Sequence, residues 1–247
     1  MLKADDLSIE RGGRAVLNGI SARFAAGEIT AIVGPNGAGK SSLILALAGL
    51  LDPVAGCVTL DERSVHALPP RERARTIGYL PQDTDIAWDV AVEQLVALGR
   101  LPHGDRGRGE VDAAIAMLSL EDLRHRPASR LSGGEKARVL LARVLAGTPR
   151  WVLADEPLAA LDLAHGQALT GHLREIAASG SGVVIVVHDL TIAMNHADRV
   201  VVLSEGQCVA TGAPAEALTR ETIKRVWGVD ADWLGKPGQH ALVIRRP

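Results

Sequence analysis

A glycine-rich run is the first stretch of the sequence whose residue types and spacing could do chemistry. Residues 34–41 read GPNGAGKS, which fits the pattern G-x-x-x-x-G-K-[ST]. In this pattern backbone N–H groups wrap phosphates, the lysine reaches the β/γ oxygens, and the hydroxyl ligates Mg²⁺. The run therefore predicts a nucleotide phosphate site, with Lys40 also assisting catalysis, formed by Gly34, Pro35, Asn36, Gly37, Ala38, Gly39, Lys40, Ser41 and Ser42.

Acidic and polar residues follow three other apolar runs. Asp155 and Glu156 end WVLADE, His188 ends VVIVVH, and Gln82 ends YLPQ. Taken alone, an Asp-Glu pair is as often a solvated strand end, and a lone histidine is usually packed or solvated. Beside a phosphate loop we predict that Asp155, Ser41 and Gln82 hold Mg²⁺, Glu156 activates water, and His188 binds the γ-phosphate.

A second anion-binding signal lies at LSGGE, residues 131–135. Ser132 and Glu135 have the spacing of a helix capping box, and Gly133 and Gly134 leave the helix start bare. Unpaired N–H groups and the positive end of the helix dipole favour an anion there. The alternative is an ordinary cap on a helix that packs through its apolar face, and the two interpretations are compatible.

These residues need a scaffold that brings strand ends together. Apolar runs at 27–34, 75–82, 150–157 and 182–189 alternate with helical patterns, which predicts an α/β fold with a mostly parallel sheet. In such sheets the functional loops lie at the carboxyl ends of the strands. Four strand ends would then meet at one nucleotide.

The remaining segments suggest two additions to this core. Residues 83–143 have helical periodicity and predict an inserted helical subdomain, while residues 2–10 and 15–24 look like antiparallel strands, as do 199–206 and 207–212. We predict an ATP-binding core from 1–82 and 144–225 and a C-terminal tail from 226–247. Its last residues, 233–247, could be either a packed extra strand or a regulatory tail.

Composition narrows the class of protein. The 247 residues are 47% hydrophobic with a net charge of −2, which supports one substantial core and argues against nucleic acid as a partner. Cys57 and Cys208 lie far apart without a metal-type spacing, so we predict free thiols. Neither a signal peptide nor an apolar run of about 18 residues is visible, so another chain would supply any membrane span.

The order of these motifs resembles the ATP-binding-cassette (ABC) ATPases along nearly the whole chain. GPNGAGKSS, the glutamine of YLPQ, LSGGE, WVLADEP, LAALD and VVHD occur in that family's order. The resemblance implies the P-loop ABC-ATPase fold, ATP and Mg²⁺ as ligands, and a head-to-tail homodimer. Ser132, Gly133 and Gly134 would cap the γ-phosphate held by the other copy.

Finer features resemble importers of iron chelates, haem and vitamin B12, namely VEQLVALGRLPH, LDLAHGQALTGHLRE and LTRETIKRVWGVD. The resemblance implies membrane permease subunits, an indirect link to a substrate-binding protein, and a cytoplasmic place on the inner face of the membrane. Residues 83–92 would receive a permease helix, with Trp88 as an anchor. A plain surface loop is the alternative.

Two departures from the family pattern bear on the site. Arg11 stands where an aromatic residue commonly stacks on adenine, and its flat guanidinium can take that place. Leu158 and Ala159 stand where Thr and Ser are common, so a hydroxyl that bridges to the partner's site is missing. Other functions considered are another importer class, a soluble ABC ATPase of DNA repair or translation, and a small-molecule kinase, which leaves LSGGE without a task.

Overall fold

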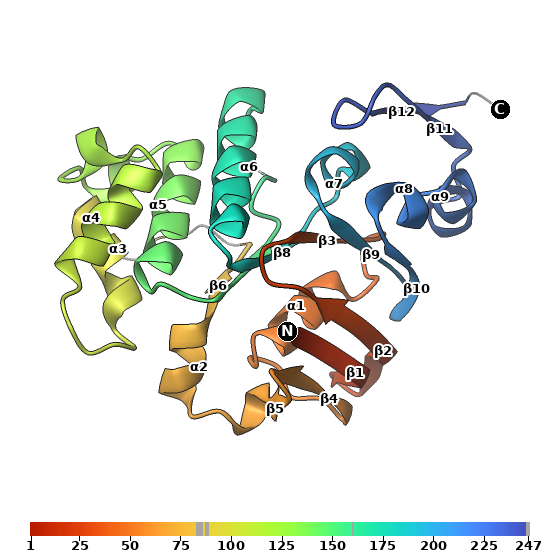
Figure 1. Ribbon diagram of the computed structural model, residues 1–247, viewed down its shortest axis with the longest axis horizontal. Helices are drawn as coiled ribbons and strands as arrows, with labels where there is room; N and C mark the ends of the chain where they lie inside the picture. Colours follow the sequence, from red (N-terminus) through yellow and green to blue (C-terminus); the bar gives the residue numbers. More distant parts are fainter. Residues whose placement is uncertain (83–85, 87–88, 160, 246–247) are drawn as a thin grey trace.

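The computed structural model describes residues 1–82, 86, 89–159 and 161–245 (Figure 1). A six-stranded sheet runs through the centre in the order β10-β9-β3-β8-β7-β6. The neighbours β9, β3, β8, β7 and β6 are parallel, and only β10 pairs antiparallel, with β9. The strands are β3 (Ile29–Val33), β6 (Ile77–Leu80), β7 (Trp151–Asp155), β8 (Gly182–Val186), β9 (Arg199–Ser204) and β10 (Gln207–Gly212).

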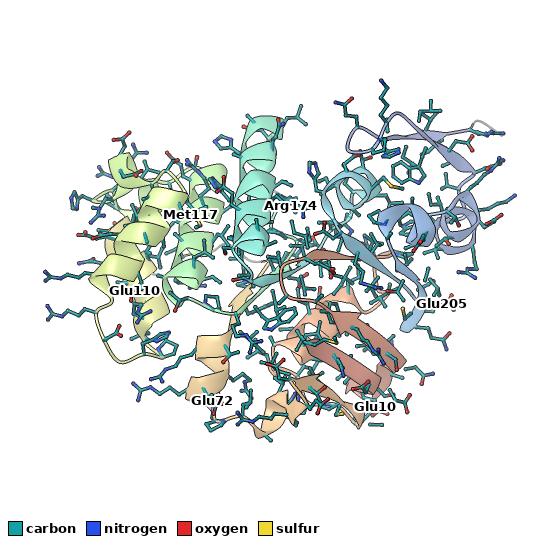
Figure 2. All side chains as sticks on the ribbon, viewed as in Figure 1. Glu10, Glu72, Glu110, Met117, Arg174 and Glu205 are labelled. Atoms are coloured by element: carbon teal, nitrogen blue, oxygen red, sulfur yellow. The ribbon has the colours of Figure 1, made fainter. Side chains whose placement is uncertain are left out.

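The inner strands β3, β7, β8 and β9 are buried on both faces, which explains why they are mostly apolar. Alternate residues of each strand enter two different apolar clusters. In β7, Val152 and Ala154 face one cluster, while Trp151 and Leu153 face the other. The side chains of both clusters fill the space between the sheet and its neighbours (Figure 2). The predicted α/β core with a mostly parallel sheet is confirmed.

The second cluster joins the central sheet to α1 (Lys40–Leu47) and to a separate antiparallel sheet. That sheet has the order β2-β1-β4-β5, and Figure 1 shows it below the centre beside α1. Its strands confirm the antiparallel pair predicted near the N-terminus. They are β1 (Leu2–Arg11), β2 (Arg14–Phe24), β4 (Ala55–Leu60) and β5 (Arg63–Ser64).

The first cluster carries the helices on the opposite face. Here α3 (Val92–Ala97), α4 (Arg108–Met117) and α5 (Gly133–Ala146) pack together, with α6 (Leu163–Ala178) beside them (Figure 1). A short helix, α2 (Pro70–Thr76), precedes β6. The division into 1–82, 83–143 and 144–225 stays a prediction, although α5 continues past the proposed boundary at 143.

The C-terminal residues fold as a hairpin against the body of the protein. After α7 (Leu190–His196), α8 (Pro214–Ala217) and α9 (Arg220–Trp227), the strands β11 (Ala231–Leu234) and β12 (Ala241–Ile244) pair only with each other. Ala231 is fully buried, and Trp233 and Leu242 pack against the first cluster. The described residues 233–245 thus contribute to a packed hairpin of two strands, and a regulatory role for this segment stays a prediction.

The two cysteines and the lengths of the helices bear on the predictions made from composition. Cys57 and Cys208 are free and partly buried, as predicted. Among the described helices, none is long and apolar enough to cross a membrane.

Candidate active site

The phosphate loop connects β3 to α1 as its motif predicted. The backbone turns through left-handed conformations at Gly37 (φ 80°) and Gly39 (φ 97°), which non-glycine residues rarely adopt. A Cβ at Gly39 would lie 2.4 Å from Leu17 Cδ2, whereas one at Gly37 would meet open space. The loop is therefore crowded by β2 on one side and open at Gly37, where a phosphate has room.

Lys40 is buried within this loop, with 5% of its surface exposed. Its Nζ donates to the carbonyl oxygens of Gly34 (2.9 Å) and Pro35 (3.0 Å). Burial lowers the pKa of the Lys40 amine, and the carboxylates of Glu156 and Asp155 oppose that shift. A phosphate would supply the negative charge that this desolvated ammonium lacks.

Asp155 ends β7 and is also buried, with 4% of its surface exposed. Burial raises the pKa of its carboxyl group, while the Ser41 hydroxyl, Lys40 and His188 lower it. Its Oδ1 is buried and has no hydrogen-bond partner among the described residues. A buried carboxylate oxygen without a donor, next to a serine hydroxyl, fits a hard cation such as Mg²⁺.

Glu156 is the centre of a hydrogen-bonded trio. Gln82 Nε2 donates to its Oε2 over 2.7 Å, and His188 Nε2 contacts its Oε1. Glu156 has a positive φ of 51°, and its N–H donates to Val186 O of the adjacent strand. The left-handed turn directs the carboxylate toward both neighbours, because β7 lies between β6 and β8.

The structure brings together the four residues predicted at strand ends, at the carboxyl ends of β6, β7 and β8. They are Gln82, Asp155, Glu156 and His188. Three of them lie one or two residues beyond the strands, since β6 ends at Leu80, β7 at Asp155 and β8 at Val186. Tyr79 belongs to the same surroundings although no motif indicated it. Burial, together with the charge of Asp155, raises the pKa of its phenol to about 12.

Arg11 lies exposed at the end of β1, opposite Arg14 of β2. The same hairpin reaches the phosphate loop two to three residues further on, where Val16 and Leu17 crowd Gly39. No hydrogen bond or ion pair joins Arg11 to residues 34–42 in the part of the chain that the structure describes. Arg11 therefore shares a hairpin with the β2 residues that crowd the phosphate loop.

Ser132 caps α5 as the capping box predicted. Its side chain accepts from the N–H of Glu135 (3.3 Å), and Glu135 Oε2 accepts from the N–H of Ser132 (2.7 Å). The pKa of Glu135 is lowered, mainly by the hydrogen bond from the Ser132 backbone N–H and also by its bond with the Ser132 side chain. Arg126 donates a further hydrogen bond to the same carboxylate. The start of this helix is thereby held in one orientation.

The bare start of α5 is away from the chain's own phosphate loop. Between the described residues 132–134 and 34–42 there is no hydrogen bond, and α5 lies on the other side of the central sheet from α1 (Figure 1). Instead Gly133 borders a cavity of about 50 Å³ whose lining includes Gln82 and Glu156. The two anion sites of this chain are therefore separate.

The groove expected at residues 83–92 cannot be placed. Residues 83–85, 87 and 88, and with them Trp88, lie outside the described part of the chain. Val92, at its end, begins α3 and is fully buried.

Comparison with known proteins agrees with the motifs. A family model described as ABC transporter matches residues 17–159. A relative named hemin import ATP-binding protein HmuV, from Rhodococcus jostii, is 40% identical over 248 residues, covering 98% of this chain and 85% of its own.

Solved structures share the fold. The structure of cbiO1 from Clostridium perfringens, part of an ABC transporter complex, superposes with a TM-score of 0.80 at 31% identity, covering 91% of this chain and 92% of its own. A dimeric ATP-binding cassette bound to ADP and Pi matches with a TM-score of 0.76 at 26% identity, covering 87% and 99%.

Proposed function

The chain belongs to the ABC transporter family, and on that premise we propose that it hydrolyses ATP to drive uptake of haem or a related metal chelate through a membrane permease. It is an ATP-binding subunit whose ATPase activity is coupled to transport. The observation that carries the proposal is the meeting of Lys40, Asp155 and the Gln82–Glu156–His188 trio at one sheet edge.

The chemistry assigned to these residues is phosphoryl transfer to water. Backbone N–H groups of 36–39 and the Lys40 ammonium bind the β/γ phosphates and stabilise charge on the transferring group. Ser41, Asp155 and Gln82 would hold Mg²⁺, which neutralises phosphate charge when bound. Glu156 takes the proton of the attacking water, and Gln82 and His188 orient its carboxylate. His188 also donates to the γ-phosphate.

The separation of the two anion sites supports a head-to-tail dimer. A helix start lying away from the chain's own phosphate loop has a use if it caps the phosphate in a second copy. Ser132, Gly133 and Gly134 would then complete the partner's site. Within its own nucleotide site, the guanidinium of Arg11 would stack on adenine. A related cassette bound to ADP and Pi is dimeric, which agrees with this arrangement.

The transported substrate class rests on the relatives. The name hemin import ATP-binding protein favours haem, and siderophore-iron and cobalamin are the related alternatives. The permease would carry the substrate, aided by a substrate-binding protein, while this chain lies on the cytoplasmic face and contacts the permease through residues 83–92. In this arrangement the substrate never touches the chain described here.

Growth on defined iron sources tests the proposal. A strain lacking this chain should fail to grow on haem as sole iron source, and the wild-type chain should restore growth. Glu156→Gln should not restore it, whereas the exposed control Glu175→Gln, whose side chain is 67% exposed on α6, should. Loss of growth on a ferric siderophore alone would reassign the substrate.

A pull-down from native membranes tests the partner. The tagged chain should retain a permease of many membrane-spanning helices. Recovery of ribosomes or DNA-repair proteins without a membrane protein would overturn the transport function, and leave a soluble ABC ATPase as the explanation.

A further inference from the structure

The start of α5 has a neighbour that the motifs did not indicate. The imidazole of His165, on α6, lies against Gly134, the second residue of α5. A Cβ built on Gly134 would be 2.8 Å from His165 Cγ and 2.9 Å from Cδ2, far inside van der Waals contact. The ring therefore fills the space that a side chain at position 134 would take.

The same imidazole is also tied to the N-cap residue of its own helix. His165 Nδ1 lies 2.8 Å from Oδ1 of Asp162, and that oxygen also accepts from the His165 N–H at 2.9 Å. Asp162 is the N-cap residue of α6. These two bonds fix the ring relative to the residue that closes the loop after Glu156.

The loop between Glu156 and Asp162 is short and turned. Its described backbone bonds are Ala159 N–H to Glu156 O (3.2 Å) and Leu161 N–H to Leu158 O (3.3 Å). The sequence EPLAALD offers no hydroxyl that could reach across to another site. Asp162, at the end of this sequence, is the N-cap of α6 and so joins the segment that begins at Glu156 to the helix that carries His165.

We propose that His165 is a positioning residue that fixes the start of α5 against the loop that carries Glu156 in the same chain. Because α5 would cap the phosphate of a second copy, His165 would couple each chain's own hydrolysis site to the cap that it provides. This inference rests on the shared-site dimer of the proposed function.

The contacts around α5 indicate why the ring matters. On one side the helix start is held by the Ser132–Glu135 capping box and by Arg126, which donates to Glu135 over 3.1 Å. Gly133 and Gly134 have no side chains with which to hold the other side. Without the ring, Gly134 would border a void and the bare N–H groups could shift by the fraction of an ångström that an aligned phosphate contact does not tolerate.

Dimer formation separates this role from ordinary packing. In the Glu156→Gln background, ATP-induced dimerisation is measured by light scattering, and ATP binding to the monomer by calorimetry. His165→Ala should weaken dimerisation about tenfold while leaving ATP affinity within about twofold, since residues 34–42 are untouched. His165→Asn, which keeps a donor for Asp162 but lacks the ring, should behave like alanine.

Two further variants complete the test. His165→Phe keeps a flat ring against Gly134 and should dimerise within about threefold of the parent. His125→Ala removes an imidazole that is 80% exposed and should change nothing. The inference is wrong if His165→Ala dimerises like its parent, or if it loses ATP affinity and thermal stability together. If the parent with His165 intact stays monomeric with ATP, the shared-site function itself fails, and this inference with it.

Discussion

Replacing Glu156 by glutamine tests the assignment of the catalytic base most directly. The carboxylate accepts from Gln82 at 2.7 Å and contacts His188, and 11% of its side chain is exposed. A glutamine carbonyl can still accept from Gln82, and its NH₂ can donate to His188 Nε2 if that ring carries its proton on Nδ1. Both contacts survive the substitution, so the side chain should stay in place.

The stability of the Glu156→Gln variant should therefore change little. Two charge-assisted hydrogen bonds become neutral, which costs about 1 kcal/mol each. Against this, the Glu156 charge raises the pKa of Asp155, so removing it relieves a repulsion between like charges. The two effects oppose each other, and the midpoint of thermal unfolding should move by no more than about 2–4 °C.

The catalytic rate should fall much further. General base catalysis contributes about 10²–10⁴-fold, which corresponds to about 3–5 kcal/mol of activation free energy. Steady-state phosphate release measures the rate, and calorimetry should show that ATP binding is retained. Glu175→Gln on the exposed face of α6 is the matched control. A variant that kept more than about a tenth of the wild-type rate would refute the assignment of Glu156 as the base.

Two other substitutions test how much stability the buried Asp155 carboxylate costs and how the C-terminal hairpin is held. Asp155→Asn should raise the unfolding midpoint of the nucleotide-free protein by about 2–4 °C per kcal/mol gained, while abolishing Mg²⁺-dependent hydrolysis. The sign follows from the raised pKa of Asp155, because the folded state holds its proton above pH 3.8 and stability falls as pH rises through that window. Asn195→Ala should loosen the β11–β12 hairpin, because the Asn195 amide bonds both the N–H (2.7 Å) and the carbonyl oxygen (2.8 Å) of His240. Hydrogen exchange of residues 231–244 should then accelerate about tenfold or more, and unchanged exchange would show that the apolar contacts of the hairpin suffice.

Local signals predicted the parts of the site that the backbone itself forms. The phosphate loop was correct at both ends, since β3 ends at Val33 and α1 begins at Lys40. The loop backbone adopts left-handed conformations at Gly37 and Gly39 that other residues rarely adopt, so the glycine spacing in the sequence predicts the shape of the loop. The capping box at Ser132 and Glu135 was readable for the same reason.

Features that depend on strand order could not be predicted. The sequence indicates that polar residues follow β6, β7 and β8, but nothing local places β7 between the other two. The central position of Glu156 in the trio follows from that order and from its own left-handed turn. The contact between His165 and Gly134 joins residues 31 positions apart, on two helices that meet only in the folded chain.

Helix boundaries and short strands were also missed for physical reasons. Asp162 caps α6 and Leu163 is its first residue. Leu163 is 94% exposed, so the apolar pattern of the helix does not include its first turn. The strands β11 and β12 have four residues each, too few for an alternating pattern to stand out.

The electrostatics of the site predict that ATP binding and stability are linked in this chain. Lys40 and Asp155 are both about 95% buried, and burial disfavours the charged form of each, lowering one pKa and raising the other. Each group therefore destabilises the nucleotide-free fold, and each is relieved by a ligand of opposite charge. Phosphate and Mg²⁺ supply those charges together, so MgATP should bind the folded chain and raise its free energy of unfolding by RT ln(1 + [L]/Kd), which a higher unfolding midpoint would report. Neutral residues in place of Lys40 and Asp155 would make the nucleotide-free protein more stable, but they would remove the charges that attract phosphate and Mg²⁺.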